Sequence, residues 1–266
     1  MRLTPVRSKK DIRLGDSDAH VHGLKKSDDE INDATEKEVS RISELQRVFY
    51  ADSRHALLIV LQGRDAAGKD GTIRKVFTAV NPQGCVVASF KAPTEIEARH
   101  DFLWRIHAQI PPRGIIGIFN RSQYEDILVP RVHKLLKKKE WAARYDQIND
   151  FEQMLAANGV VILKFMLHIS RAEQKRRLEE RLADPSKNWK FRVGDLDDRR
   201  KWPEFTKAYH GILANTSTKW APWYIVPADN KHVRNWLIAR TIADTLEGLK
   251  LRYPPGDPEI VGIKVD

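Results

Sequence analysis

The residues with the clearest chemical potential form a glycine-rich string, GRDAAGKD, from Gly63 to Asp70. Its spacing is G-x-x-x-x-G-K, in which glycines let the backbone curl so that successive N–H groups point at phosphate oxygens. Lys69 adds a mobile positive charge for the outer phosphates. A tight turn with a solvated lysine is the alternative interpretation. We predict a phosphate-binding loop made of Gly63, Arg64, Asp65, Ala66, Ala67, Gly68, Lys69, Asp70 and Gly71.

One position departs from the usual pattern of such loops. A Ser or Thr that holds magnesium ordinarily follows the lysine, and Asp70 stands there instead. A carboxylate can also bind magnesium, and Asp65 within the loop is an equally good candidate. The departure argues against a free ATPase or GTPase switch and favours a specialised kinase.

A second string, NRSQYED from Asn120 to Asp126, combines a guanidinium with two carboxylates. Arg121 can meet a phosphate with two parallel hydrogen bonds. Glu125 and Asp126 offer the hard oxygen ligands that magnesium prefers. An acidic helix start would explain the two carboxylates but not the arginine. The string therefore predicts a second wall of the phosphate site.

The surrounding elements must bring these two strings together. Five apolar runs are too short for typical helices and rich in branched residues, so we predict buried strands; they are 55–62, 84–89, 114–119, 159–167 and 223–226. Stretches of helical period alternate with them, at 28–52, 69–79, 95–109, 141–157, 171–182, 200–215 and 231–249. The alternation predicts an α/β fold, a five-stranded parallel sheet with helices on both faces. Ligands bind beyond the carboxyl ends of such strands, where both strings begin.

Segment boundaries follow from composition. Residues 1–27 are polar and without clear period, so we expect an N-terminal arm, followed by a single kinase domain over 28–266. Within that domain, residues from about 184 to 200 are charged, include Pro185 and Gly194, and carry few apolar side chains. We predict a mobile active-site lid there. Among the aromatic residues, Trp104, Trp202 and Trp236 fall at helical spacing, so we expect them in the core.

The composition narrows the class of partner. The 266 residues carry 46 Lys and Arg against 36 Asp and Glu, a formal charge of +10, which favours an anionic ligand. No apolar run approaches the roughly 18 residues of a membrane helix, and no apolar segment follows the basic N-terminal residues. Cys85 is the only cysteine, which excludes an internal disulfide. We expect a cytoplasmic protein with no membrane partner.

Four separated segments resemble the family-2 polyphosphate kinases. They are GRDAAGKDG at 63–71, NRSQYED at 120–126, HISRAEQKRRLEERLADPSKNWKF at 168–191 and TKWAPWYIVPADNK at 218–231. Their order and spacing fit that family from about residue 28 to 249. The resemblance implies a P-loop kinase fold and a magnesium-dependent enzyme that moves a terminal phosphoryl group between inorganic polyphosphate and a nucleotide. It also suggests a homo-oligomer, either a dimer or a tetramer.

The second string points to one subgroup of the family. Many members carry an aspartate at the position of Asn120, in a D-R-S-x-Y-N-R string. This chain has Asn120, Glu125 and Asp126 instead, which is similar to class III. That subgroup is associated with phosphorylating AMP as well as ADP, so the resemblance implies conversion of AMP and ADP to ADP and ATP, reversibly. Guanine nucleotides are an alternative acceptor, and Mn²⁺ is an alternative to Mg²⁺.

The site residues follow from this chemistry. Phosphoryl transfer needs alignment and neutralisation of charge on the moving group, roles that we assign to Lys69 and Arg121. Asp65 is the best candidate to hold the metal or orient the acceptor, and Asp126 is a second metal candidate. Further phosphate or nucleotide contacts are predicted for Lys75, Asn120, Glu125, Arg131, Arg177, Arg181 and Lys190. Arg177 and Arg181 share a helix face, which could equally be a solvated charged surface.

Two other functions fit parts of the sequence. An ATP-dependent small-molecule or nucleoside monophosphate kinase would share the loop and the lid but would not require the later family segments. A nucleic-acid-binding protein would explain the positive charge, but we find no nucleic-acid motif and no interleaved stacking aromatics. We therefore expect polyphosphate and adenine nucleotides as partners, and no nucleic acid.

Overall fold

The structure is a computed structural model that describes residues 1–263. Its centre is a sheet of five strands in the order β2-β3-β1-β4-β5, in which every neighbouring pair is parallel. The strands are β1 (Ala56–Gly63), β2 (Cys85–Ser89), β3 (Ile116–Asn120), β4 (Val160–His168) and β5 (Trp223–Pro227). The predicted five-stranded parallel sheet is confirmed, with each strand within two residues of its expected range.

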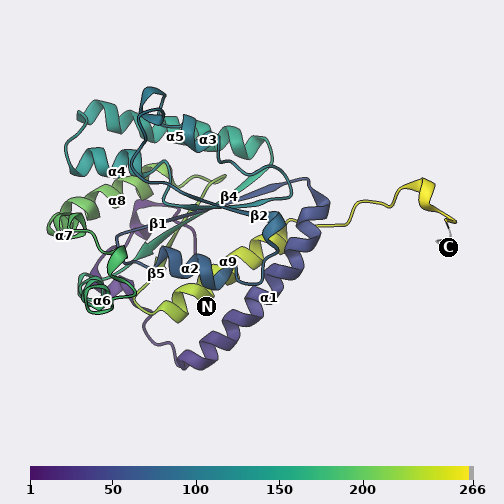
Figure 1. Cartoon of the computed structure of the whole chain (residues 1–266), viewed down its shortest axis with the longest axis horizontal. Coiled ribbons are helices and arrows are strands. Elements are labelled where there is room, and N and C mark those ends of the chain that lie inside the picture. Colours follow the sequence, from purple (N-terminus) through teal and green to yellow (C-terminus); the bar gives the residue numbers. More distant parts are fainter. Residues whose placement is uncertain (264–266) are drawn as a thin grey trace.

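Helices cover both faces of the sheet, as Figure 1 shows. One layer contains α3 (Trp104–His107), α4 (Glu125–Val132), α5 (Lys138–Ala157) and α8 (Trp202–Thr216). The other contains α1 (Asp28–Asp52), α2 (Lys69–Val76) and α9 (Lys231–Gly248). Two more helices, α6 (Arg171–Ala183) and α7 (Gly194–Arg200), lie beyond the carboxyl ends of the strands. Because these ends meet at one edge of the sheet, that edge can hold a site built from several strands.

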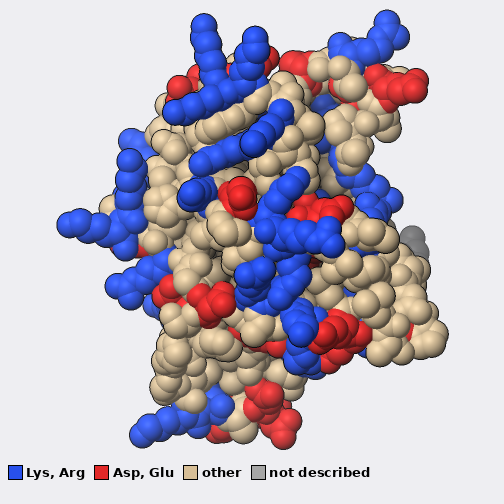
Figure 2. All heavy atoms as spheres, turned by 90° about the vertical axis from the view of Figure 1, so that its left-hand side faces the viewer, with Lys and Arg blue, Asp and Glu red and all other residues tan. Residues whose placement is uncertain are grey.

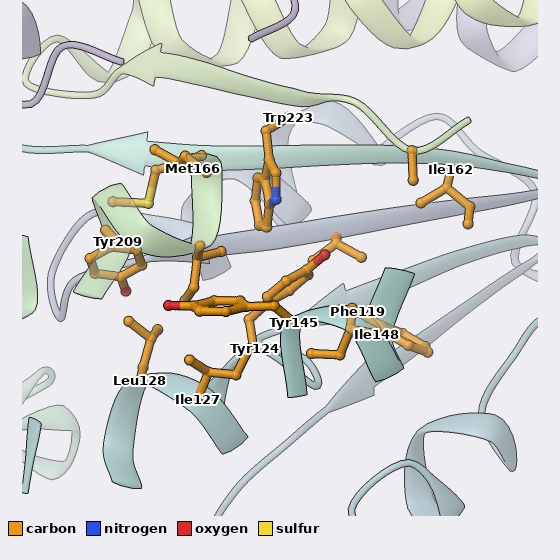
Figure 3. Close-up of a cluster of buried hydrophobic side chains, with 14 of the residues drawn as sticks. Phe119, Tyr124, Ile127, Leu128, Tyr145, Ile148, Ile162, Met166, Tyr209 and Trp223 are labelled. Atoms are coloured by element: carbon orange, nitrogen blue, oxygen red, sulfur yellow. The ribbon is translucent and has the colours of Figure 1, made fainter. Parts of the chain in front are cut away.

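Burial explains why the strands could be recognised. All eight residues of β1 are buried, since a central parallel strand is covered on both faces and must be apolar throughout. The edge strand β2 is more exposed, and Val86 and Val87 are about half exposed. Figure 3 shows the core between the sheet and the layer of α4, α5 and α8, where Tyr124 packs edge-on against Trp223 with ring centroids 4.8 Å apart.

The expected helix over 95–109 is wrong. The segment instead forms a 3₁₀ turn at Glu97–Arg99 and the single turn of α3. Asp101 accepts a hydrogen bond from the backbone N–H of Leu103 at 2.9 Å, and such local side-chain bonds compete with a continuous helix. The expectation of a core position for Trp104 fails with it, because this side chain is 43% exposed and stacks on His100. Trp236 is buried as expected, and Trp202 is half-buried.

The N-terminal residues 1–27 lie against the sheet edge. Pro5 forms an antiparallel bridge with Tyr224 of β5, and the N–H of Val6 donates to the carbonyl of Trp223 at 2.8 Å. Further along, His168 Nε2 lies 2.8 Å from the carbonyl oxygen of Gly15. The arm therefore completes the β5 edge by backbone contacts, which explains its lack of hydrophobic period.

The segment from 184 to 200 crosses the carboxyl edge of the sheet. It contains a 3₁₀ turn at Asn188–Lys190 and then α7. Trp189 is 76% exposed. Within residues 1–263, none of the helices is both long enough and apolar enough to cross a membrane.

Candidate functional site

The phosphate loop follows β1 and leads directly into α2. Gly68 has a φ of +101°, and a Cβ placed there would stand 2.0 Å from Nη1 of Arg234. Only glycine fits this position, because the backbone is left-handed and a buried guanidinium packs against it. Ala66 is also left-handed, with a φ of +62°. The loop curls as its sequence predicted.

Lys69 lies beneath the curl. Its Nζ donates to the carbonyls of Gly63 at 2.7 Å and Arg64 at 3.3 Å, and the side chain is buried. Burial, with the positive charge of Arg121 nearby, lowers the pKa of Lys69 to about 8. The ammonium group therefore has backbone oxygens as its hydrogen-bond acceptors, and it loses its proton more readily than an exposed lysine.

Arg121 joins the two strings of the sequence. Its backbone N–H donates to the carbonyl of Leu61 at 3.1 Å, since β3 pairs with β1 and Asn120 lies opposite Leu61. The guanidinium donates to Asp65 at 2.8 Å and to Glu125 at 3.2 Å. The negative charge of Glu125, followed by that of Asp65, raises the pKa of Arg121. Arg121 has a φ of +65°, a strained conformation for a non-glycine residue.

Two more arginines support the loop from behind. Arg177 of α6 donates to the carbonyls of Ala66 at 3.0 Å and Ala67 at 3.3 Å. Arg234 of α9 donates to Ala67 at 3.2 Å. Burial lowers the pKa of Arg234 to about 9, and the charge of Arg177 adds to this effect. Positive charge thus gathers under the loop, which favours an anion above it.

A cleft of about 1130 Å³ opens beside the loop, between α2, α6, the segment 184–200 and the start of α9. Twelve Lys and Arg side chains line it against seven Asp and Glu. Figure 2 looks on to this side of the molecule, where Lys and Arg form a band across the surface. Most of the predicted phosphate contacts line this cleft: Asp65, Ala66, Gly68, Lys69, Asp70, Gly71, Asn120, Arg121, Arg177, Arg181 and Lys190.

A second, smaller pocket shares Asp65 and Arg121 with the cleft. One wall is apolar and comes from α4 and α8, with Leu128, Val129, Trp202, Phe205 and Tyr209. Polar groups of the pocket include Gly63, Arg64, Glu125, Gln174 and Asp198. Arg64 lies over the ring of Trp202, with Cζ 3.8 Å from its centroid, and donates to Thr206. A cationic cleft and an apolar pocket therefore meet at Asp65 and Arg121.

The sequence model of the polyphosphate kinase 2 family matches residues 25–253 of this chain. The chain belongs to that family. The resemblance stated from four short segments is thereby confirmed.

Several named proteins are similar over nearly the whole chain. An AMP/ADP-polyphosphate phosphotransferase of Meiothermus ruber is 52% identical over 225 residues, 85% of this chain and 84% of that protein. An ADP-polyphosphate phosphotransferase of Rhodopseudomonas palustris is 43% identical over 259 residues, 93% and 90% of the two chains. The crystal structure of polyphosphate kinase 2 from Arthrobacter aurescens has 40% sequence identity and a TM-score of 0.87, covering 96% of this chain and 95% of that one.

Four predicted site residues lie outside both the cleft and the small pocket, as far as residues 1–263 show: Ala67, Lys75, Asp126 and Arg131. Ala67 is fully buried within the loop. Lys75 points from α2 toward α1 and forms an ion pair with Glu36. Arg131 donates to the hydroxyl of Tyr145 at 3.0 Å. Asp126 pairs with the buried Arg105 at 3.2 Å, whereas Glu125 pairs with Arg121. Burial raises the pKa of Asp126 despite this pairing.

The acidic residues beside the phosphate loop supply some of the ligands of a metal ion, and substrate phosphates would supply others. Residues 1–263 contain no group of three or more His, Cys, Asp or Glu that could hold a metal ion alone. Magnesium bound to phosphates usually keeps several waters and needs only one or two carboxylates. Asp65 and Glu125 supply two, both bridged by Arg121. The donor set therefore suits Mg²⁺ carried with a phosphate chain.

Sequence reasoning missed several residues of the site. Arg234 lies in the buried stretch 233–239 of α9, in which only Arg234 and Asn235 are polar, and a cation in such a stretch was an available signal. Asp198 and the apolar wall on α8 gave no local signal, because their place in the pocket depends on how α7 and α8 pack against α4.

Proposed function

We propose that this protein transfers phosphoryl groups from inorganic polyphosphate to AMP and ADP, giving ADP and ATP, and that the reaction is reversible. The observation that carries the proposal is the junction at Asp65 and Arg121 between a large cationic cleft and a small pocket with an apolar wall. Membership of the polyphosphate kinase 2 family and the names of the similar proteins support the same reaction.

The cleft and the small pocket suit the two substrates, polyphosphate and a nucleotide. A polyphosphate chain is a linear polyanion, and the cleft offers separated cations on both walls, from Arg74 on α2 to Arg192 in the lid. A nucleoside needs apolar surface for its base, which Trp202, Phe205 and Tyr209 offer. The pocket itself holds about 40 Å³, so its walls must move apart when a nucleoside binds.

The chemistry requires charge neutralisation more than proton transfer. The acceptor is a phosphate oxygen that is already ionised, so no general base is needed for the attack. Lys69 and Arg121 neutralise the transferred group, and the backbone N–H groups of the loop orient it. Mg²⁺, or Mn²⁺, bound with the phosphates would add a further positive charge. Asp65, together with Glu125 in place of Asp126, would hold that ion.

The remaining expectations are part of the same proposal. Residues 28–266 act as one catalytic domain, with 184–200 as a lid that closes over the cleft. The protein forms a homo-oligomer, a dimer or a tetramer. Because adenine nucleotides are the proposed acceptors, with guanine nucleotides as an alternative, we propose a cytoplasmic location.

A luciferase-coupled assay tests the proposal. Purified protein with polyphosphate, Mg²⁺ and either AMP or ADP should give ATP, and Lys69→Ala should lower kcat by roughly a hundred- to a thousandfold while circular dichroism stays unchanged. No ATP from either nucleotide would overturn the proposal. Phosphorylation of AMP by ATP with indifference to polyphosphate would point instead to a nucleoside monophosphate kinase.

A further inference from the structure

The small pocket contains a carboxylate that the phosphate chemistry does not use. Asp198 lies on α7 and lines the pocket together with Phe205 and Tyr209. Its Oδ1 is 2.9 Å from Nε2 of His133, which follows the end of α4. Among the contacts of residues 1–263, its second oxygen, Oδ2, has no hydrogen-bond partner. A carboxylate oxygen is therefore available to a ligand in this pocket.

The direction of this contact is fixed by a third residue. Lys201 Nζ lies 2.8 Å from Nδ1 of His133. An ammonium group can only donate, so Nδ1 accepts and the ring proton sits on Nε2, where it donates to Asp198. The ring of His133 also packs edge-on against Phe205, with centroids 6.2 Å apart. The chain Lys201–His133–Asp198 thus orients the carboxylate from three elements: α4, α7 and the start of α8.

The neighbours of Asp198 indicate which part of a nucleotide it would meet. Asp65 at the phosphate loop repels it, and this repulsion adds to burial in raising the pKa of Asp198. The two arginines of the pocket are engaged elsewhere, Arg64 with Thr206 and Arg121 with Asp65. A carboxylate facing this pocket would repel a phosphate and accept hydrogen bonds from hydroxyl groups.

By the proposed function, a nucleotide in this pocket would have its phosphates at Asp65 and Arg121 and its base on the apolar wall. Its ribose would then lie between them. We propose that Asp198, oriented by His133 and Lys201, accepts hydrogen bonds from the ribose hydroxyls of the acceptor nucleotide and thereby selects ribonucleotides. This inference rests on the proposed nucleotide binding but does not depend on polyphosphate as the donor.

Calorimetric titration with ADP and with 2′,3′-dideoxyADP tests the inference without requiring turnover. The wild type should bind ADP roughly 10- to 100-fold more tightly than the dideoxy analogue, the range expected for hydrogen bonds to a charged acceptor. Asp198→Ala should lose most of this preference by weakening ADP binding alone. His133→Ala should give a smaller loss in the same direction, because it frees the carboxylate to rotate.

Asp197→Ala is the matched control. Asp197 lies on the same helix but pairs with Arg200 at 2.7 Å, and its removal should leave both affinities unchanged. Equal weakening of ADP and of the analogue by Asp198→Ala would overturn the inference, as would a wild type that binds both equally or does not bind ADP. Selective ADP binding in a protein that makes no ATP from polyphosphate would overturn the proposed function and leave this inference standing.

Discussion

The ammonium group of Lys69 lies against backbone carbonyls of the phosphate loop. Its Nζ reaches the carbonyls of Gly63 and Arg64, and burial lowers its pKa to about 8. A phosphate chain above the loop would offer the ammonium group ionised acceptors in place of neutral carbonyls. Phosphate binding therefore favours the protonated form and raises this pKa again. Binding of the anion and protonation of Lys69 are coupled.

This coupling predicts an alkaline limit for polyphosphate use. Above the pKa of about 8 the free protein carries neutral Lys69, which no longer attracts phosphate. The kcat/KM for polyphosphate should then fall as pH rises, approaching a tenfold loss for about each pH unit above 8. Arg121, whose pKa is raised, stays charged throughout. Initial rates measured between about pH 6.5 and 9.5 at fixed free Mg²⁺ give the profile.

Lys69→Arg provides the control for that profile. A guanidinium stays charged over the whole interval, so the variant should be slower but without the alkaline fall. A flat profile for the wild type, or the same fall in the arginine variant, would assign the limit to another group.

At the scale of elements, β4 places the charged side chain of Lys164 in the core. Lys164 and Glu152 of α5 are both fully buried, with Nζ 2.5 Å from Oε2. The same carboxylate accepts hydrogen bonds from the hydroxyl of Tyr124 at 2.8 Å and the amide of Gln123 at 3.0 Å. These two residues follow Arg121 by two and three positions. The buried pair thus anchors the segment that holds Arg121 in its left-handed conformation.

Breaking this pair should cost stability. Lys164→Met leaves Glu152 buried without its cation, and the free energy of unfolding should fall by roughly 3–5 kcal/mol. The double variant Glu152→Gln/Lys164→Met removes both charges and should recover most of that loss. Urea denaturation at pH 7 followed by tryptophan fluorescence measures both. A single variant as stable as the wild type would show that the buried pair contributes little.

The sequence predicted those elements whose burial is uniform. The apolar runs of β1 and β4 identified central strands even though Lys164 interrupts the second. The region 95–109 failed because Asp101 forms a local backbone contact that hydrophobic period does not register. In the site, Asp65, Lys69 and Arg121 were predictable because each belongs to a short string with a fixed geometry.

Residues brought in by tertiary packing could not be predicted in the same way. Arg234 reaches the loop from α9, and Asp198 reaches the small pocket from α7. Lys75 and its neighbour Arg74 show the limit most directly. Both are cations one residue apart on α2, yet only Arg74 lines the cleft, while Lys75 turns to Glu36. Only the packing of α1 against the rest of the fold distinguishes them.

For the whole molecule, the formal net charge is +10, and the cleft alone is lined by twelve Lys and Arg against seven Asp and Glu. Figure 2 shows Lys and Arg across the face that carries it. Arg74 and Lys91 line one part of the cleft, and Lys187, Lys190 and Arg192 of the segment 184–200 line another. A chain of a few phosphates can occupy the loop alone, whereas a longer chain can also reach these outer cations. Affinity should therefore rise with polyphosphate length and fall with salt.

Arg74 and Lys75 allow a matched test of this outer contact. Arg74→Ala removes a cation that lines the cleft, so affinity for long polyphosphate should fall by roughly three- to tenfold. Binding of tripolyphosphate should change little, since that chain need not extend beyond the loop.

Lys75→Ala removes the same formal charge from the same helix but outside the cleft, and should leave both affinities within about twofold. The salt dependence should separate the variants as well, because losing one phosphate contact makes the slope of log affinity against log salt shallower by roughly one. Competition binding with long and short polyphosphate at several salt concentrations measures the two affinities of each variant and their salt dependence. Equal effects of the two substitutions would mean that overall positive charge, and not the line of cations along the cleft, attracts the polyphosphate chain.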